Sequence, residues 1–151
     1  MRRDATSNRA EPLTVRLARP EERQALEDLM RGASLALEAY REQLQAHPEV
    51  IELPAEQIAS GDVFVAELDG RIAGFVALVG GEIDGLFVEP DLWRRGIGAV
   101  LVEEAAHEVR RRGLSLTVVA GPEARGFYES CGFGVEGDEA TRFGPAFRMS
   151  R

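Results

Sequence analysis

Two tight turns between three short apolar segments constrain the fold of this 151-residue chain most strongly. The first two segments, residues 63–68 and 71–79, flank Asp69-Gly70, a pair that is typical of a two-residue hairpin turn. A glycine pair, Gly80-Gly81, then separates them from residues 82–88. Turns this short join antiparallel neighbours, because a parallel pair needs a long crossover. The sequence therefore predicts three consecutive antiparallel strands.

The rest of the chain alternates between helical and strand-like patterns. Hydrophobic periodicity predicts a strand at 13–18, a helical stretch from 20 to about 47 with a break near Gly32, a short helix at 54–59, a helix at 96–112, a strand at 114–120, a helix at 122–130 and one or two strands in the tail. This order is that of a mixed α/β domain, in which helices cover a sheet.

Length and composition fit one globular domain. Hydrophobic residues make up 44% of the chain and charged residues 29%, and no apolar run approaches the roughly 20 residues that a membrane helix needs. We expect a disordered tail at 1–12 and a single domain at 13–151. The tail carries positive charge without an apolar stretch behind it, so it does not resemble a signal peptide. With one cysteine, Cys131, and no export signal, the expected compartment is the cytoplasm.

Charge argues against several classes of partner. The formal net charge is −8 and the pI is about 4.9, which opposes nucleic-acid binding. The dense basic runs are Arg94-Arg95 and residues 110–112, and the second ends a predicted helix, where cations complement the helix dipole. An acidic chain favours a cationic amine as a partner. Two histidines and one cysteine are too few for a zinc cluster, and no metal site is expected.

The junction at residues 88–101 is the first segment that indicates a chemistry. A strand runs into a loop that holds Gly96 and Gly98 and opens a helix. The first amides of a helix have no intrahelical partner and carry partial positive charge, and glycines let a ligand approach the backbone. Arg94 and Arg95 add formal charge. The segment predicts a cradle for a pyrophosphate, and a plain strand-to-helix turn is the alternative.

Two widespread phosphate loops fit this junction poorly. A P-loop has Lys and then Ser or Thr after its second glycine, where this chain has Ala99 and Val100. A Rossmann fingerprint has Gly or Ala at the position of Leu101. Neither loop explains the two glycines.

A second segment, residues 121–133, strengthens the case. Its sequence is similar to the motif Asn-x-x-Ala-x-x-Phe-Tyr-x-x-x-Gly-Phe, with matches at Ala124, Phe127, Tyr128, Gly132 and Phe133. The earlier junction is similar to the motif Gln/Arg-x-x-Gly-x-Gly/Ala. In this order, the two motifs resemble those of the GNAT superfamily of acyl-CoA N-acyltransferases. The chain departs from them at Trp93 and at Gly121, where an amide contact to the pantetheine arm would be missing.

The resemblance implies a fold and an activity. The expected sheet is mostly antiparallel with helices on both faces, and it splays between the strand that ends at Val88 and the strand at 114–120. The expected activity is that of an N-acetyltransferase, which moves an acetyl group from acetyl-CoA directly to a primary amine, and a homodimer is expected. The acceptor, a small-molecule or a peptide amine, is left open because no motif marks residues 20–60. The residues assigned to the co-substrate are Leu86, Val88, Arg94, Arg95, Gly96, Ile97, Gly98, Ala99, Gly121 and Ala124.

The reaction also needs proton transfer, because a protonated amine cannot attack a thioester and the leaving thiolate benefits from a donor. The resemblance places Tyr128 as that donor, and packing beside the neighbouring phenylalanines is the alternative. Glu82 stands fourteen residues before Gly96, a spacing that resembles the glutamate base of the histone acetyltransferase branch. Asp84 on the same strand face, a water chain, or a carboxylate that is merely solvated are the alternatives.

Two other functions stay open at this point. The chain could be a non-catalytic acyl-CoA-binding sensor or interaction module, or a nucleotide-binding regulatory domain that does not use coenzyme A. Tyr40 lies in the region that covers the acceptor pocket in the family, and core packing is its alternative. Cys131, His47 and His107 are weaker candidates for a role in the site.

Overall fold

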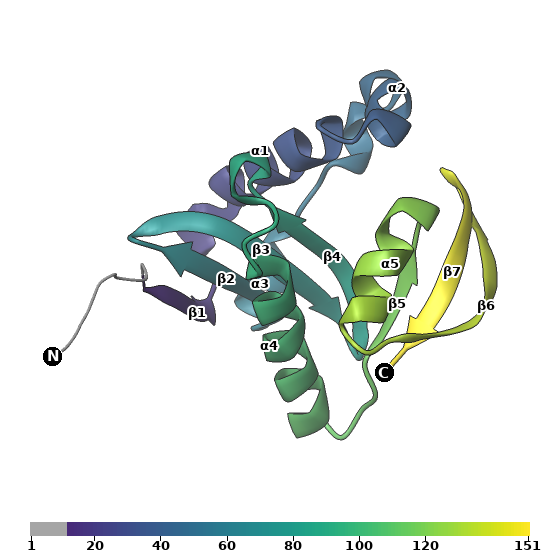
Figure 1. Cartoon of the computed structure of the whole chain (residues 1–151). Helices are drawn as coiled ribbons and strands as arrows, with labels where there is room; N and C mark the ends of the chain where they lie inside the picture. The colour runs from purple at the N-terminus through teal and green to yellow at the C-terminus, as the bar shows by residue number, and fades with distance from the viewer. Residues whose placement is uncertain (1–11) are drawn as a thin grey trace, which may run out of the picture.

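The computed structural model describes residues 12–151, which contain a seven-stranded sheet in the order β1-β2-β3-β4-β5-β7-β6 (Figure 1). The strands are Leu13–Leu17 (β1), Val63–Leu68 (β2), Arg71–Val79 (β3), Glu82–Val88 (β4), Thr117–Ala120 (β5), Gly134–Thr141 (β6) and Gly144–Ser150 (β7). Every neighbouring pair is antiparallel except β4 and β5, which run parallel. The mixed, mostly antiparallel sheet is confirmed. The predicted tail at 1–12 lies outside the described residues apart from Pro12.

The helices follow the predicted positions closely. They are Pro20–Glu22 (η1), Arg23–Leu35 (α1), Glu38–Ala46 (α2), Pro48–Val50 (η2), Ala55–Ala59 (α3), Pro90–Leu92 (η3), Ile97–Arg111 (α4) and Pro122–Ser130 (α5). The break in the first helical stretch falls at residues 36–37 rather than near Gly32. Gly32 stays helical because burial of Leu29 and Ala33 outweighs the roughly 1 kcal/mol that a glycine costs inside a helix.

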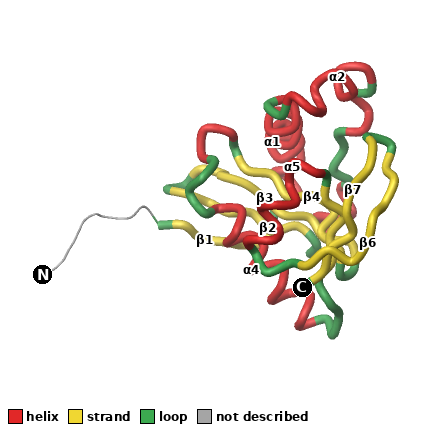
Figure 2. Tube along the Cα trace, turned by 45° about the vertical axis from the view of Figure 1, so that its right-hand side comes forward, coloured by secondary structure: helices red, strands yellow, loops and turns green. Residues whose placement is uncertain are grey.

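Two apolar layers hold helices against opposite faces of the sheet. On one face, Leu26 of α1 and its neighbours pack with Phe75 of β3. On the other face, Leu101 of α4 packs with Val76. Adjacent strand residues point to opposite faces, so β3 supplies both layers and is buried along most of its length. Figure 1 shows α1 and α4 on opposite sides of the strands, and Figure 2 shows α1 and α2 together above the sheet.

The sheet opens between β4 and β5. Only Glu82 and Ile83 of β4 pair with β5, opposite Thr117 and Val118, and beyond them the two strands separate. The predicted splay is therefore confirmed. β5 starts at Thr117 and not at Leu114, because the Leu114 amide still donates to the Val109 carbonyl and closes the end of α4.

A β-bulge at Asp84 sets the direction of the β4 side chains. Ala77 pairs with Gly85 and Leu78 pairs with Ile83, which leaves Asp84 as the extra residue. The bulge resets the alternation, so Leu86 packs with the α4 layer while Phe87 contacts Phe75 in the α1 layer, with ring centroids 5.4 Å apart.

Candidate active site

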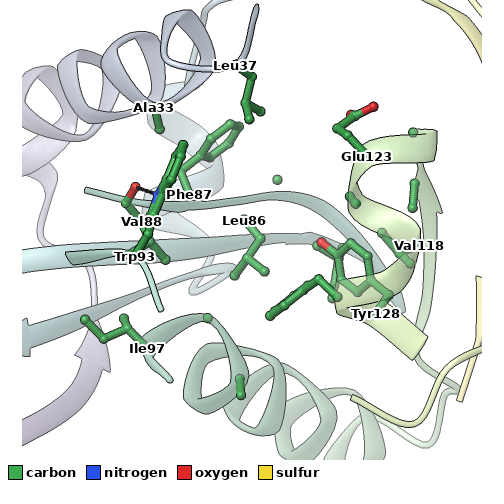
Figure 3. A pocket seen from close by; sticks show the side chains of 18 of the residues that line it. Ala33, Leu37, Leu86, Phe87, Val88, Trp93, Ile97, Val118, Glu123 and Tyr128 are labelled. Atoms are coloured by element: carbon green, nitrogen blue, oxygen red, sulfur yellow. Dashed lines mark hydrogen bonds between the residues drawn. The ribbon is translucent and has the colours of Figure 1, made fainter. Parts of the chain in front are cut away.

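A cleft of about 930 Å³ lies where β4 and β5 separate. Its walls come from residues 83–88 of β4, residues 118–120 of β5, the start of α4, one face of α5 and residues of α1 and α2 (Figure 3). The volume and the largely apolar lining are typical of ligand sites in proteins. The splay thus creates a cavity that leaves the β4 edge beyond Ile83 without a strand partner.

The structure brings most of the predicted co-substrate residues together. Nine of the ten line the cleft, and the exception is Arg95. Arg94 does line it, and its backbone φ is 68°, a left-handed value that non-glycine residues seldom adopt. Strain of this kind concentrates at functional sites. Of the two arginines in the loop, only Arg94 is therefore placed to contact a ligand in the cleft.

The start of α4 presents free amides to the cleft. Gly96 is the residue before the helix, with a φ of 81°, and no side chain within the described part of the chain caps it. The first amides of α4 therefore remain available to a ligand or to water. Gly98 has a different role, because a Cβ there would lie 3.0 Å from the Cζ of Phe127. Its missing side chain lets α5 pack closely against α4.

Tyr128 is buried on α5 at one side of the cleft, with 6% of its surface exposed. Its ring packs edge-on against Phe127 and Phe133, with centroids 5.0 and 5.3 Å away. Its hydroxyl points across the cleft toward Leu86 (Figure 3) and finds no hydrogen-bond partner among the described residues. Burial raises the pKa of this hydroxyl above its usual value, with a smaller contribution from Cys131, so it stays protonated at neutral pH. Tyr128 thus packs in the core and also presents a donor.

The two candidate carboxylates on β4 lie in different places. Asp84, the bulge residue, lines the cleft and is exposed to it. Glu82 pairs with Val79 and Thr117 at the closed end of the β4–β5 gap and does not line the cleft. Regular strand alternation predicts both side chains on one face of the sheet. The bulge at Asp84 interrupts that alternation, so the two carboxylates have different surroundings.

A second cavity, about 700 Å³ in volume, adjoins the cleft on the α1–α2 side. Tyr40, Asp84 and Glu123 line both cavities. The Tyr40 hydroxyl donates to the Glu123 carboxylate, which ties α2 to the start of α5. Burial, and then this carboxylate, raise the pKa of Tyr40. Tyr40 therefore belongs to the site region rather than to the core.

Comparison with known proteins identifies the family. A family model described as an acetyltransferase (GNAT) domain matches residues 59–135, just over half of the chain. The chain belongs to the GNAT family. It is 36% identical over 101 residues to peptidyl-lysine N-acetyltransferase YjaB of Salmonella typhimurium, in a match that covers 66% of this chain and 64% of that protein. The match thus spans less than two thirds of that relative's length.

Solved structures share the GNAT fold over nearly the whole chain. Apo-form YjaB from Escherichia coli superposes with a TM-score of 0.71 at 26% identity, covering 92% of this chain and 97% of that one. PaiA N-acetyltransferase from Thermoplasma acidophilum, solved in complex with coenzyme A, gives a TM-score of 0.73 at 20% identity over 93% of this chain and 98% of that one.

The two departures from the GNAT motifs have structural reasons. The indole Nε1 of Trp93 donates to the Val88 carbonyl at 2.8 Å and ties the loop to the end of β4 (Figure 3). At Gly121, a Cβ would collide with the Tyr40 hydroxyl and lie 2.6 Å from a Glu123 carboxylate oxygen. The usual Asn would not fit while Tyr40 and Glu123 are in contact. Sequence reasoning missed this pairing because no local pattern links Tyr40 to α5.

No helix within 12–151 has the length and apolar character needed to cross a membrane. Within the same residues, no cluster of three or more His, Cys, Asp or Glu side chains is arranged to hold a metal ion.

Proposed function

We propose that this GNAT chain is an N-acetyltransferase that moves an acetyl group from acetyl-CoA directly to a primary amine. The observation that carries the proposal is the Tyr128 hydroxyl, which is buried, protonated, directed into the cleft and without a hydrogen-bond partner among residues 12–151. An unsatisfied buried donor is costly unless a ligand uses it. The names of the YjaB and PaiA relatives, both N-acetyltransferases, support the same activity.

The lining of the cleft fits the parts of acetyl-CoA. The free amides at the start of α4, together with Arg94, would hold the pyrophosphate. The unpaired edge of β4 around Leu86 would hold the pantetheine arm through backbone hydrogen bonds. When bound, acetyl-CoA supplies the thioester that the amine attacks.

The protein would contribute two proton transfers. Tyr128 donates a proton toward the position of the leaving sulfur. An alkyl ammonium group has a pKa near ~10 and must lose a proton before it attacks. We propose that Asp84 accepts this proton, directly or through water, because it is the carboxylate of β4 that lines the cleft. The role first predicted for Glu82 is less consistent with its position at the closed end of the gap.

Calorimetric titration with acetyl-CoA is the first test, with ADP and NAD as controls. Micromolar binding of acetyl-CoA alone, followed by thiol release when amines are added, supports the proposal. Binding without turnover of any amine would favour a non-catalytic acyl-CoA sensor. Tighter binding of ADP or NAD would favour a nucleotide-binding regulatory domain.

Three predictions about the whole protein stay proposals. We propose a single domain at 13–151, a homodimer and a cytoplasmic location. Limited proteolysis tests the domain, because a protected fragment should begin near residue 13. Light scattering at several concentrations tests the dimer, and fractionation of cells tests the location.

A further inference from the structure

The second cavity has a one-sided charge balance. Apolar side chains from α1, α2, residues 50–51 and the β6–β7 hairpin form most of its wall. Among residues 12–151, its charged side chains are two carboxylates, Asp84 and Glu123, and no arginine of that range lines it. The chain contains no lysine at all. Because Glu123 already accepts from the Tyr40 hydroxyl, a ligand that matches such a wall carries one positive charge near Asp84 and is apolar over the rest of its surface.

Two aromatic rings that contact each other form part of the cavity wall. Phe143, in the turn between β6 and β7, meets Tyr40 of α2 edge-on, with centroids 5.9 Å apart and planes at 73°. The turn is held by Thr141, whose Oγ1 accepts from the Phe143 amide at 3.2 Å and donates to the Gly144 carbonyl at 2.7 Å. Arg142 lies over the Phe143 ring, 5.7 Å from its centroid, but does not line the cavity. The two rings therefore form an apolar corner, a ring face beside a ring edge, against which an aromatic ligand can pack.

The cavity continues into the cleft that Tyr128 faces. Ser34, Tyr40, Asp84 and Phe87 line both spaces. A molecule whose apolar body lies beside Phe143 can therefore extend an amine past Asp84 into the cleft.

The same lining disfavours other amines. A free amino acid would place its carboxylate in a cavity where the charged groups that the described part of the chain supplies are both carboxylates. A polyamine or an aminosugar would set several charges or hydroxyls against apolar walls.

We propose that the acceptor is an arylalkylamine, a primary amine with a single positive charge on an aromatic body, and that its body packs against the Tyr40–Phe143 pair. The inference rests on the proposed acetyltransferase function. In the reaction, the amine nitrogen forms a bond to the acetyl carbonyl carbon and the carbon–sulfur bond breaks. The ammonium group first loses one proton to Asp84 or to water. The sulfur leaves with the electron pair and takes a proton from Tyr128, and the nitrogen gives its second proton to the Tyr128 oxygen, directly or through water, as the amide forms.

Phenethylamine and phenylalanine form the matched pair that tests the proposal, because they differ only in the α-carboxylate. With acetyl-CoA saturating, we expect kcat/KM for phenethylamine to exceed that for phenylalanine by about 100-fold or more. A lysine-containing peptide is the third acceptor, and acetyl-lysine in that assay comes only from the peptide because the chain has no lysine. Equal or better turnover of phenylalanine or of the peptide would overturn the proposal.

Phe143→Ala tests the location of the aromatic body. We expect KM for phenethylamine to rise about 10-fold while KM for acetyl-CoA stays the same. Val135→Ala on the same hairpin is the control, since Val135 is exposed and lines neither cavity. An unchanged KM for phenethylamine in Phe143→Ala would contradict the assigned position.

Direct binding separates failure of this inference from failure of the proposed function. If acetyl-CoA does not bind and no amine releases thiol, the proposed function fails and this inference fails with it. If acetyl-CoA binds and another amine is acetylated while phenethylamine is not, only the acceptor class is wrong. If phenethylamine binds to the protein with coenzyme A present but is not acetylated, the cavity assignment holds and the catalytic proposal fails.

Discussion

The two sides of the cleft differ in how they are encoded. The side formed by β4, α4 and α5 comes from residues 82–133, in which two motifs mark backbone features such as the left-handed Gly96 and the close approach at Gly98. The other side, formed by α1 and α2, leads into the second cavity, whose wall joins Tyr40, Glu123 and Phe143 from distant parts of the chain. The first side is thus readable from local sequence, and the second exists only after folding.

Tyr128→Phe should have the largest effect and would test the motif side alone. Removing the hydroxyl leaves the packing against Phe127 and Phe133 in place. We expect kcat to fall by about 100-fold or more, since a general acid contributes roughly that much. The affinity for acetyl-CoA, measured by calorimetry, should change little. A kcat within threefold of the original would leave Tyr128 as a packing residue.

The pH profile gives a second view of Tyr128. Because burial raises the pKa of this hydroxyl above its ordinary value of about 10, its protonated form persists through the alkaline range in which a free tyrosine ionises. We therefore expect kcat, measured at saturating amine, to hold steady from pH 8 to about 10. A decline with an apparent pKa near or below 10 that disappears in Tyr128→Phe would show that the hydroxyl titrates normally.

Asp84→Asn should have the next largest effect, because Asp84 lines both the cleft and the second cavity. We expect kcat/KM for the amine to fall by about 30-fold near neutral pH and to recover partly at high pH, where the free amine needs no base. The matched variant is Glu82→Gln, two residues away and outside both cavities, for which the expected change is below threefold. The opposite ranking would return the role of base to Glu82.

Gly96→Ala is expected to have a smaller effect, and Gly113→Ala is its control. The two glycines flank α4, have φ values of 81° and 75°, and have open space where a Cβ would stand. Each substitution should reduce the free energy of unfolding by about 1 kcal/mol through backbone strain alone. Only Gly96→Ala should also lower the affinity for acetyl-CoA, by about 10-fold. Equal loss of affinity in both variants would mean that the amides of α4 are not specifically used.

The elements were predictable where local signals are strong. The Asp69-Gly70 turn fixed the β2–β3 hairpin, and its two residues have φ values of 55° and 79°. The start of β5 was misplaced because Leu114 continues the apolar pattern although its amide belongs to the end of α4. The bulge at Asp84 was not predicted, although the neighbouring Gly85 is the kind of residue that often marks a bulge inside a strand.

The site was predictable to the same degree and for the same reason. Co-substrate residues such as Gly98 act through backbone shape, and a motif records backbone shape well. The contact of Tyr40 with Glu123 depends on how α2 docks beside α5, which no sequence spacing reports. The contact between Tyr40 and Glu123 also explains Gly121. The motif has Asn at this position, but the two side chains occupy the space that a Cβ would need.

Glu108→Gln should leave both sides of the cleft unchanged and alter stability alone. Glu108 lies at the far end of α4 from Gly96, accepts hydrogen bonds from Arg111 and Arg112, and is held close to Asp62 through Arg112. These arginines, Arg111 first, lower the pKa of Glu108 from 4.5 to about 2. We expect the substitution to reduce the free energy of unfolding at pH 7 by roughly 1–2 kcal/mol, with kcat and acetyl-CoA affinity unaltered.

The sign of the pH dependence follows from the lowered pKa. A carboxylate that is more acidic in the folded state contributes its full stability above the unfolded-state pKa and loses it as the pH falls toward the folded-state pKa. The difference in free energy of unfolding between the original protein and Glu108→Gln should thus be constant from pH 7 to 5. It should then shrink as the pH falls from about 4.5 toward 2. Urea unfolding at a series of pH values measures it. If the difference in free energy of unfolding is still undiminished at pH 3, Glu108 stabilises α4 by packing rather than by its charge. The stability of the far end of the helix would then not depend on ionisation, in contrast to its start, where the free amides are expected to bind the co-substrate.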